Sequence, residues 1–336
     1  MAKTERLTLK KYILKLILFF IITLASVIIG IWVGPVKISF PELVSALISP
    51  SSSQTVSQII WEIRIPRVLF AIAVGGGLSI AGAVFQAILM NPLAEPYILG
   101  ISSGGTFGSV LSFLIGVSFL GTQIFSFAGA IIVMLLVFVL SRRFGELEPN
   151  VLLLTGIMIG AFFSAAILLL ITLLNDSLRT AVFWLMGNLS IAPKESLKYV
   201  LPITAIVSFV LVINANKFNL LSLGDDTAKQ LGINITFVKN STYLLTSIMI
   251  GSIVSVSGVV GFVGLLIPHI CRMIFGVDNR IVVPASFFLG AAYLALADTV
   301  ARTIVAPSEL PVGAVTALIG APIFVYLLKQ NFKLRG

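Results

Sequence analysis

Long stretches of this chain contain no Asp, Glu, Lys or Arg, and this feature restricts the possible folds more than any other. A helix needs about 20 apolar residues to cross a hydrocarbon core about 30 Å thick. Hydrophobic residues make up 58% of the sequence and charged residues 10%, against roughly 25% charged in a soluble domain. We therefore expect an all-α polytopic membrane protein. The charge-free stretches run from 16 to 36, 68 to 94, 96 to 141, 149 to 175, 199 to 216, 240 to 271 and 310 to 328, with a shorter one at 281 to 297.

Two of these stretches are too long for a single span. Gly116 and Gly121 lie near the middle of 96–141, and 240–271 contains Gly258, Gly261, Gly264 and Pro268. Gly and Pro are the residues that most often interrupt helices, so we divide each stretch into two. The sequence then predicts about ten transmembrane helices in one transmembrane domain over residues 1–336.

The distribution of basic residues predicts the orientation in the membrane. With ten spans and a cytoplasmic N-terminus, fifteen of the 22 Lys and Arg residues lie inside and seven outside. This is the bias that the positive-inside rule describes. An odd number of spans would place the basic segment 329–335 outside. We expect both termini in the cytoplasm, and the net charge of +9 gives no reason to expect a nucleic-acid partner.

An internal repeat is suggested when the sequence is shifted by 176 residues. Residues 78–100 then superimpose on 254–276, and the repeat units cover approximately 64–175 and 240–328. The first copy enters its span from outside and the second from inside, so the repeat has inverted topology, a plan common in transporters. The identical pairs are Ser79 and Ser255, Gly82 and Gly258, Val84 and Val260, Leu89 and Leu265, Pro92 and Pro268, Ile98 and Ile274, and Gly100 and Gly276.

Two polar segments carry helix signals. Ser39 is followed three residues later by Glu42, the pattern of a capping box, and predicts a short external helix over 39–47. The longest cytoplasmic segment is 216–239. Within it Asp225 and Asp226 favour the start of a short helix over 227–231, which Gly232 ends in the left-handed conformation.

Several function classes lack the residues that they need. No Gly-x-x-x-x-Gly-Lys-Ser/Thr phosphate loop occurs, so the chain is not expected to bind ATP in that way. Cys271 is the only cysteine and His269 the only histidine, which leaves no set of residues for a metal site of several thiolates or imidazoles. Asp298 is the nearest candidate for an intramembrane carboxylate. We expect neither an enzyme nor a cofactor in this chain.

Two sets of motifs resemble the iron-chelate, haem and cobalamin permease family of binding-protein-dependent ABC importers, the FecCD type. They lie in order across nearly the whole chain. The first set is Arg64-Ile-Pro-Arg67, Gly82 with Gln86, Asn91-Pro-Leu-Ala-Glu-Pro96 and Leu99-Gly100. The second is Phe262-Val-Gly-Leu-Leu-Ile-Pro268-His269-Ile-Cys-Arg272, Asp298-Thr-Val-Ala-Arg302, Glu309-Leu-Pro311-Val-Gly313 and Gly320-Ala-Pro322-Ile-Phe324.

The resemblance implies the type II ABC importer permease fold, with ten helices per subunit, in a bacterial or archaeal cytoplasmic membrane. It also implies a second permease subunit, either the same chain or a paralogue, and two cytoplasmic ATPase subunits that hold ATP and magnesium. An extracytoplasmic solute-binding protein would deliver the cargo. An iron-siderophore complex is the expected cargo, and haem and cobalamin are the alternatives within the family.

The resemblance assigns roles to specific residues. Arg64, Arg67 and Arg302 are expected on the external face, where they would meet acidic residues of the binding protein, because arginine grips carboxylates with two parallel hydrogen bonds. Anchoring of these arginines at the membrane interface is the alternative. The cytoplasmic loop would form the coupling helix that docks on the ATPase, and its residues are Leu223, Gly224, Asp225, Asp226, Ala228, Leu231 and Gly232.

The translocation pathway is expected along helices at about 150–174 and 312–328. Small or hydroxylated residues there suit either close helix packing or a weakly binding wall; they are Gly160, Ser164, Thr316 and Gly320. A structural motif at the helix breaks is expected from Gln86, Asn91, Pro92, Pro268 and His269. Buried amides need partners, so we interpret Gln86 and Asn91 as structural, and we expect His269 to fix a helix start.

One alternative from another class remains at this point. A carrier or channel driven by a solute gradient would need no ATPase. The cytoplasmic segment 220–232 and the lack of an intramembrane carboxylate cluster both favour the ABC permease.

Overall fold

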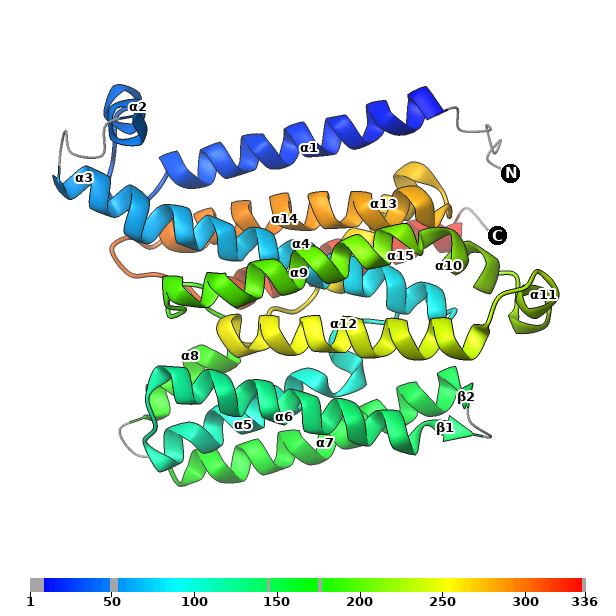
Figure 1. The fold of residues 1–336 in the computed structure, drawn as a ribbon. Coiled ribbons are helices and arrows are strands. Elements are labelled where there is room, and N and C mark those ends of the chain that lie inside the picture. The colour runs from blue at the N-terminus through cyan, green and yellow to red at the C-terminus, as the bar shows by residue number, and fades with distance from the viewer. Residues whose placement is uncertain (1–8, 49–53, 144–145, 175–176, 334–336) are drawn as a thin grey trace.

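The computed structural model describes residues 9–48, 54–143, 146–174 and 177–333. Its long helices run along one common direction and form a single bundle (Figure 1). The first half contains α1 (Leu9–Trp32), α2 (Phe40–Ile48), α3 (Gln54–Gln58), the π-helical turn η1 (Ile59–Arg64), α4 (Ile65–Ile88), the 3-10 turn η2 (Pro96–Leu99), α5 (Ile101–Ile115), α6 (Phe119–Leu140), β1 (Arg142–Arg143), β2 (Glu146–Leu147) and α7 (Pro149–Thr172). The second contains α8 (Leu178–Leu185), η3 (Lys194–Ser196), α9 (Leu197–Ile213), α10 (Ala215–Leu221), α11 (Asp225–Gln230), α12 (Ile235–Ser257), α13 (Val263–Phe275), α14 (Asn279–Thr303) and α15 (Val312–Lys333).

Within the described residues, seven helices are long and apolar enough to cross a membrane. They include α1, α4, α6, α7, α9, α14 and α15, and α5 and α13 are shorter apolar helices. Helix α12 is of comparable length but carries more polar residues. Each predicted charge-free stretch therefore contains one or two helices, and strands occur in the described part only as the short β1–β2 hairpin.

Both overlong stretches break at glycines named from the sequence, whereas Gly121 lies inside α6 and Gly264 and Pro268 lie inside α13. Gly116 adopts φ +69° and ends α5 in the left-handed region. Gly258 at φ +64° ends α12, and Phe262 at φ +67° precedes α13. We call residues 258–262 the second break, and the connection 89–100 between α4 and α5 the first break.

Helix α4 lies at the centre of the bundle, because small residues let its neighbours approach closely. A Cβ atom on Gly75 would lie 2.3 Å from the Gly290 carbonyl oxygen of α14. A Cβ atom on Gly82 would lie 1.7 Å from the Gly264 carbonyl oxygen of α13. Such small-residue contacts are the usual way in which helices pack closely within a bilayer.

The bundle has two distinct ends. Helices α2, α3 and α8 lie at one end, which we call the α8 end, and α11 and the β1–β2 hairpin lie at the other, the α11 end (Figure 1). The start of α1 and the end of α15 also lie at the α11 end. The predicted capping box is present: both the Ser39 backbone N–H and hydroxyl donate to Glu42 Oε2, at 2.8 and 2.7 Å.

The residue pairing predicted for the repeat, at an offset of 176, is wrong, because paired residues lie in different local structures. Gly82 lies inside α4, whereas Gly258 ends α12. Pro92 lies in the first break, whereas Pro268 lies inside α13. The offset of 176 residues follows the Gly and Pro matches, which in this case occupy different structural positions.

The two repeat units nevertheless have the same order of elements. Each begins with a long helix, continues through a break to a short apolar helix, and ends with two long helices. The elements are α4, α5, α6 and α7 in the first unit and α12, α13, α14 and α15 in the second.

Candidate docking, coupling and pathway sites

At the α8 end, Arg67 forms a buried charged network with two carboxylates. Its Nε donates to both oxygens of Asp298, at 3.0 and 2.9 Å. One terminal nitrogen donates to Glu309 Oε2 at 2.7 Å. The Asp298 side chain is 1% exposed and that of Glu309 33%, so the network reaches the surface only through Glu309.

The other two predicted docking arginines bind backbone carbonyls. Arg64 donates to the carbonyls of Ile31 and Trp32, the last two residues of α1, and of Val36 after it. Arg302 donates to the carbonyl of Gly30 and, at 3.2 Å, to the Thr299 hydroxyl, and its Nε lies 4.0 Å from Asp298.

The structure gathers all three arginines at one end but places their side chains inside. Arg64, Arg67 and Arg302 are 2, 5 and 2% exposed. They tie α1, α4 and α14 together, so direct contact with a binding protein remains a prediction. The sequence did contain a signal for an ion pair at Asp298, because Asp298 and Arg302 are four residues apart on one helix.

The segment predicted to be cytoplasmic forms a short helix at the α11 end, which begins two residues before and ends one residue before the predicted range 227–231. Helix α11 covers Asp225–Gln230, and Gly224 and Gly232 flank it at φ +98° and +82°. Asp225 and Asp226 lie in its first turn. Its apolar neighbours Leu223 and Leu231 are 60 and 56% exposed. A short helix flanked by exposed leucines is suited to pack against another protein.

Two contacts of this segment were not evident from the sequence. The Lys239 ammonium group, on α12, donates to Asp225 Oδ2 at 2.7 Å and is itself 4% exposed. Asn219 of α10 donates to Asp278, the N-cap of α14, at 2.7 Å. These contacts join α11 to α12 and α10 to the start of α14. Ala228 is fully buried, so it packs within the segment and does not reach the surface.

The motif residues near the breaks join α4 to α13. Arg272 donates to Gln86 Oε1 at 2.6 Å and to the Ala83 carbonyl at 3.1 Å. The Gln86 amide is directed to the Ala94 and Leu265 carbonyls, at 3.3 and 3.5 Å.

The remaining motif residues have separate roles. Asn91 Oδ1 accepts the Leu93 N–H in a local turn at 2.9 Å, and Pro92 is exposed. Pro268 is buried inside α13. His269 also lies well inside α13 and packs edge-on against Phe324 at 5.5 Å. The expectation that His269 fixes a helix start is therefore wrong, because α13 begins at Val263.

The sequence analysis missed a direct connection between the two breaks. Glu95 Oε1 accepts the Phe262 N–H at 2.9 Å, and the Tyr97 hydroxyl accepts the Val260 N–H at 3.1 Å. A Cβ atom on Gly320 of α15 would lie 2.7 Å from the Phe262 Cβ. The first break therefore fixes the second, and the second supports one of the predicted pathway helices.

The predicted pathway residues have two kinds of surroundings. Gly160 of α7 lies near Gly100 and Ser103, and Ser164 is exposed in the single chain. Thr316 is fully buried, and Gly320 packs against Phe262. Within the described residues, no group of three or more His, Cys, Asp or Glu side chains could hold a metal ion.

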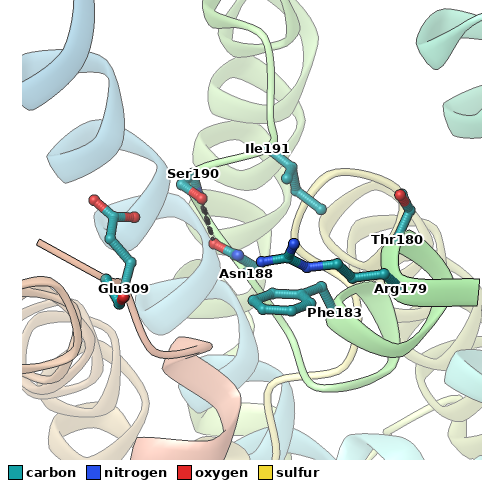
Figure 2. Close-up of a pocket in the computed structure, with 8 residues that line it drawn as sticks. Arg179, Thr180, Phe183, Asn188, Ser190, Ile191 and Glu309 are labelled. Atoms are coloured by element: carbon teal, nitrogen blue, oxygen red, sulfur yellow. Dashed lines mark hydrogen bonds between the residues drawn. The ribbon is translucent and has the colours of Figure 1, made fainter. Parts of the chain in front are cut away.

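A polar cleft of about 430 Å³ opens at the α8 end. Its walls come from α8, the connection after α8 and the segment before α15 (Figure 2). Arg179 lies over the Phe183 ring at 5.7 Å, and Asn188 Oδ1 accepts both the Ser190 N–H and its hydroxyl at 2.8 Å. Glu309 lies on the opposite side in Figure 2.

Comparison with known proteins agrees with these features. The model of the FecCD transport family matches residues 22–330. The uncharacterized ABC transporter permease protein YvrB of Bacillus subtilis is 38% identical, with 92% of this chain and 91% of that protein covered. The hemin transport system permease protein HmuU of Yersinia pestis is 37% identical, with 90 and 91% covered.

A solved structure has the same fold. It is described as an inward-facing conformation of an ABC transporter of metal-chelate type, and it superimposes with a TM-score of 0.84 at 32% identity. The match covers 94% of this chain and 98% of the other. The family model spans nearly the whole chain and includes both breaks, the buried arginines and the α11 segment. This chain belongs to the FecCD transport family.

Proposed function

We propose that this chain is the permease subunit of a binding-protein-dependent ABC importer, and that it carries an iron-siderophore complex or a related metal chelate. Membership of the FecCD transport family is the observation that carries this proposal. The likeness to an ABC transporter structure of metal-chelate type supports it. Haem and cobalamin remain the alternative cargoes. The permease itself is a transport subunit and not an enzyme.

The proposed assembly contains a second permease subunit, two ATPase subunits that bind ATP and magnesium, and an extracytoplasmic solute-binding protein. Exposed apolar faces support contacts beyond this chain: Met158, Phe162 and Leu169 of α7 are 60 to 69% exposed, and Leu318 of α15 is 76% exposed. Lipid and a second permease subunit together would cover such faces.

In this proposal ten helices cross the cytoplasmic membrane as an inverted repeat, with the α11 end in the cytoplasm. The shared order of elements in the two units and the excess of basic residues at the cytoplasmic side support this orientation. The binding protein docks on the surface of the α8 end. Arg64, Arg67 and Arg302 stabilise this end from inside the bundle.

The mechanism follows from how the ends are connected. Closure of the ATPase subunits moves α11, and the ion pair between the buried Lys239 and the half-buried Asp225 transmits this movement to α12. Helix α12 ends at the second break, which packs against α15. Movement at the cytoplasmic face can therefore rearrange a pathway helix without a strong binding site in the pathway itself.

ATPase activity in lipid tests the proposal. The permease is purified together with its ATPase and assayed with and without the loaded binding protein. Leu231→Asp places a charge on the exposed surface beside α11, and we expect it to abolish the stimulation. Val277→Asp is the matched control, because Val277 is 78% exposed and lies between α13 and α14. Transport without any ATPase would instead establish a gradient-driven carrier.

A further inference from the structure

The polar cleft at the α8 end has the dimensions of a small-molecule site. Its volume of about 430 Å³ lies within the range of ligand pockets, about 300 to 1,000 Å³. A second hollow of about 200 Å³ adjoins it and shares Ser190 and Glu309 with it. None of the predicted docking, coupling or pathway residues lines the main cleft.

The charges of the cleft favour an anion. Glu309 is the carboxylate among its lining residues, and it pairs at 2.7 Å with Arg67, which also pairs with Asp298. Arg179 contributes a guanidinium group that lies over the Phe183 ring in a cation–π contact. Arg179 is exposed and lines the cleft, so its guanidinium group faces the space that a ligand would occupy.

A second donor lies beside Arg179. Asn188 is 5% exposed, and its Oδ1 is occupied by Ser190, which fixes the orientation of the amide. The Nδ2 group then points away from Ser190, and in the described part of the chain it donates to no protein acceptor. Asn188 and Arg179 both line the cleft, and Figure 2 shows both side chains. Two N–H donors that line one cleft, one of them charged, suit a carboxylate ligand.

The cleft is also connected to the second break. Asn188 N–H donates to the Ser257 carbonyl at the end of α12, at 2.8 Å. Gly313 N–H of α15 donates to the Gly187 carbonyl at 3.2 Å. A ligand bound to Asn188 would therefore contact the 187–188 backbone, which is hydrogen-bonded to the end of α12 and the start of α15.

We propose that this cleft is a reception site for an anionic, carboxylate-bearing metal chelate, with Arg179 and Asn188 as its donors. The inference rests on the proposed function, and it adds a specificity-determining site at the outer mouth of the permease. An acidic side chain of the binding protein offers the same chemistry. The cleft volume favours the chelate, because a single carboxylate side chain would leave most of the cleft empty.

The experiment labels a cysteine placed in the cleft. Cys271 is fully buried, so the background labelling is low. T180C is treated with a negatively charged and a positively charged methanethiosulfonate reagent, in the assembled complex in lipid. We expect R179Q to lower the labelling rate of the negative reagent relative to that of the positive reagent about tenfold. A unit charge about 6 Å away raises the local concentration of one monovalent ion about threefold in water and lowers that of the opposite ion about threefold. V117C is the control cysteine at the same end, and K198Q the control for loss of one exposed charge.

Ferric citrate serves as the anionic chelate and a ferric trihydroxamate as the neutral one. We expect ferric citrate to slow labelling of T180C but not of V117C, and R179Q to abolish this protection. An unchanged rate ratio in R179Q, or equal protection by the neutral chelate, would overturn the proposal. Protection by the empty binding protein alone would also overturn it and would identify the partner's carboxylate as the occupant.

The ATPase assay on the same preparation separates the two proposals. If the binding protein stimulates the wild-type ATPase while the labelling shows no effect of Arg179, only the cleft proposal fails. If stimulation is absent in the wild type, the proposed function itself fails, whatever the labelling shows.

Discussion

The buried arginine network allows a quantitative test of what Arg67 does. Replacing Arg67 with Met would leave the Asp298 carboxylate, 1% exposed, with only Arg302 nearby at 4.0 Å. Removing one partner of a buried ion pair costs about 3–5 kcal/mol, because the other charge is left without compensation. Replacing both partners with apolar residues of similar volume is often neutral. We therefore expect R67M to be less stable by about 3–5 kcal/mol and R67M/D298L to recover part of this loss, because the buried Arg302 keeps its bonds to Gly30 and Thr299 but loses Asp298.

Unfolding in mixed detergent micelles, followed by tryptophan fluorescence, measures the free energies of the four proteins in the cycle. If the two single changes add up in the double variant, the coupling between Arg67 and Asp298 inferred from their 2.9 Å contact is wrong. The ATPase assay then separates structure from docking. A double variant with partly restored stability and normal stimulation by the binding protein would exclude direct docking through Arg67, whereas lost stimulation would support it.

Three further outcomes are expected. Gly82→Ala should reduce the yield of folded protein strongly, because its Cβ would lie 1.7 Å from a backbone oxygen, whereas Gly261→Ala, with nothing within 4 Å, should be tolerated in a thermal-shift assay. Hydrogen bonds from Ser39 lower the pKa of Glu42, so its stabilisation of α2 is present at neutral pH and lost as the pH falls through that lowered pKa. The protection of α2 amides from hydrogen exchange, taken relative to the intrinsic exchange rate at each pH, should then decrease in acid, and E42Q should remove this pH dependence. Glu95→Ala leaves the Phe262 N–H without its acceptor, at a cost of about 1–3 kcal/mol, while Glu95→Gln keeps an oxygen there; equal transport by the two variants would contradict the role of this contact.

The sequence predicted the helices well because the bilayer imposes a simple rule on it. Charge-free length decides where a span can be, and glycine decides where an overlong stretch breaks, as at Gly116 and Gly258. The capping box at Ser39 and Glu42 was predictable for a similar reason, since its residues are close in sequence. The repeat register failed because identical Gly and Pro residues occupy helix interiors in one unit and breaks in the other.

The site was less predictable because its contacts join residues that are distant in sequence. Charge counting placed Arg67 at the external side, but it could not show that Arg67 would be buried and paired with Asp298 on another helix. Lys239 was read only as a cytoplasmic charge, although its ammonium group is buried against Asp225. In each case the sequence gives the charge, and only the packing decides whether that charge faces a partner protein or the interior.

The contact between the two breaks suggests why both are irregular. A continuous helix satisfies its own backbone groups, so it offers no free N–H to another element. The second break leaves the N–H groups of Val260 and Phe262 available, and Tyr97 and Glu95 of the first break accept them. The two irregular segments thus satisfy each other inside the bundle, away from lipid. A conformational change that moved one break without the other would leave these polar groups unpaired, so we expect the two breaks to move together during transport.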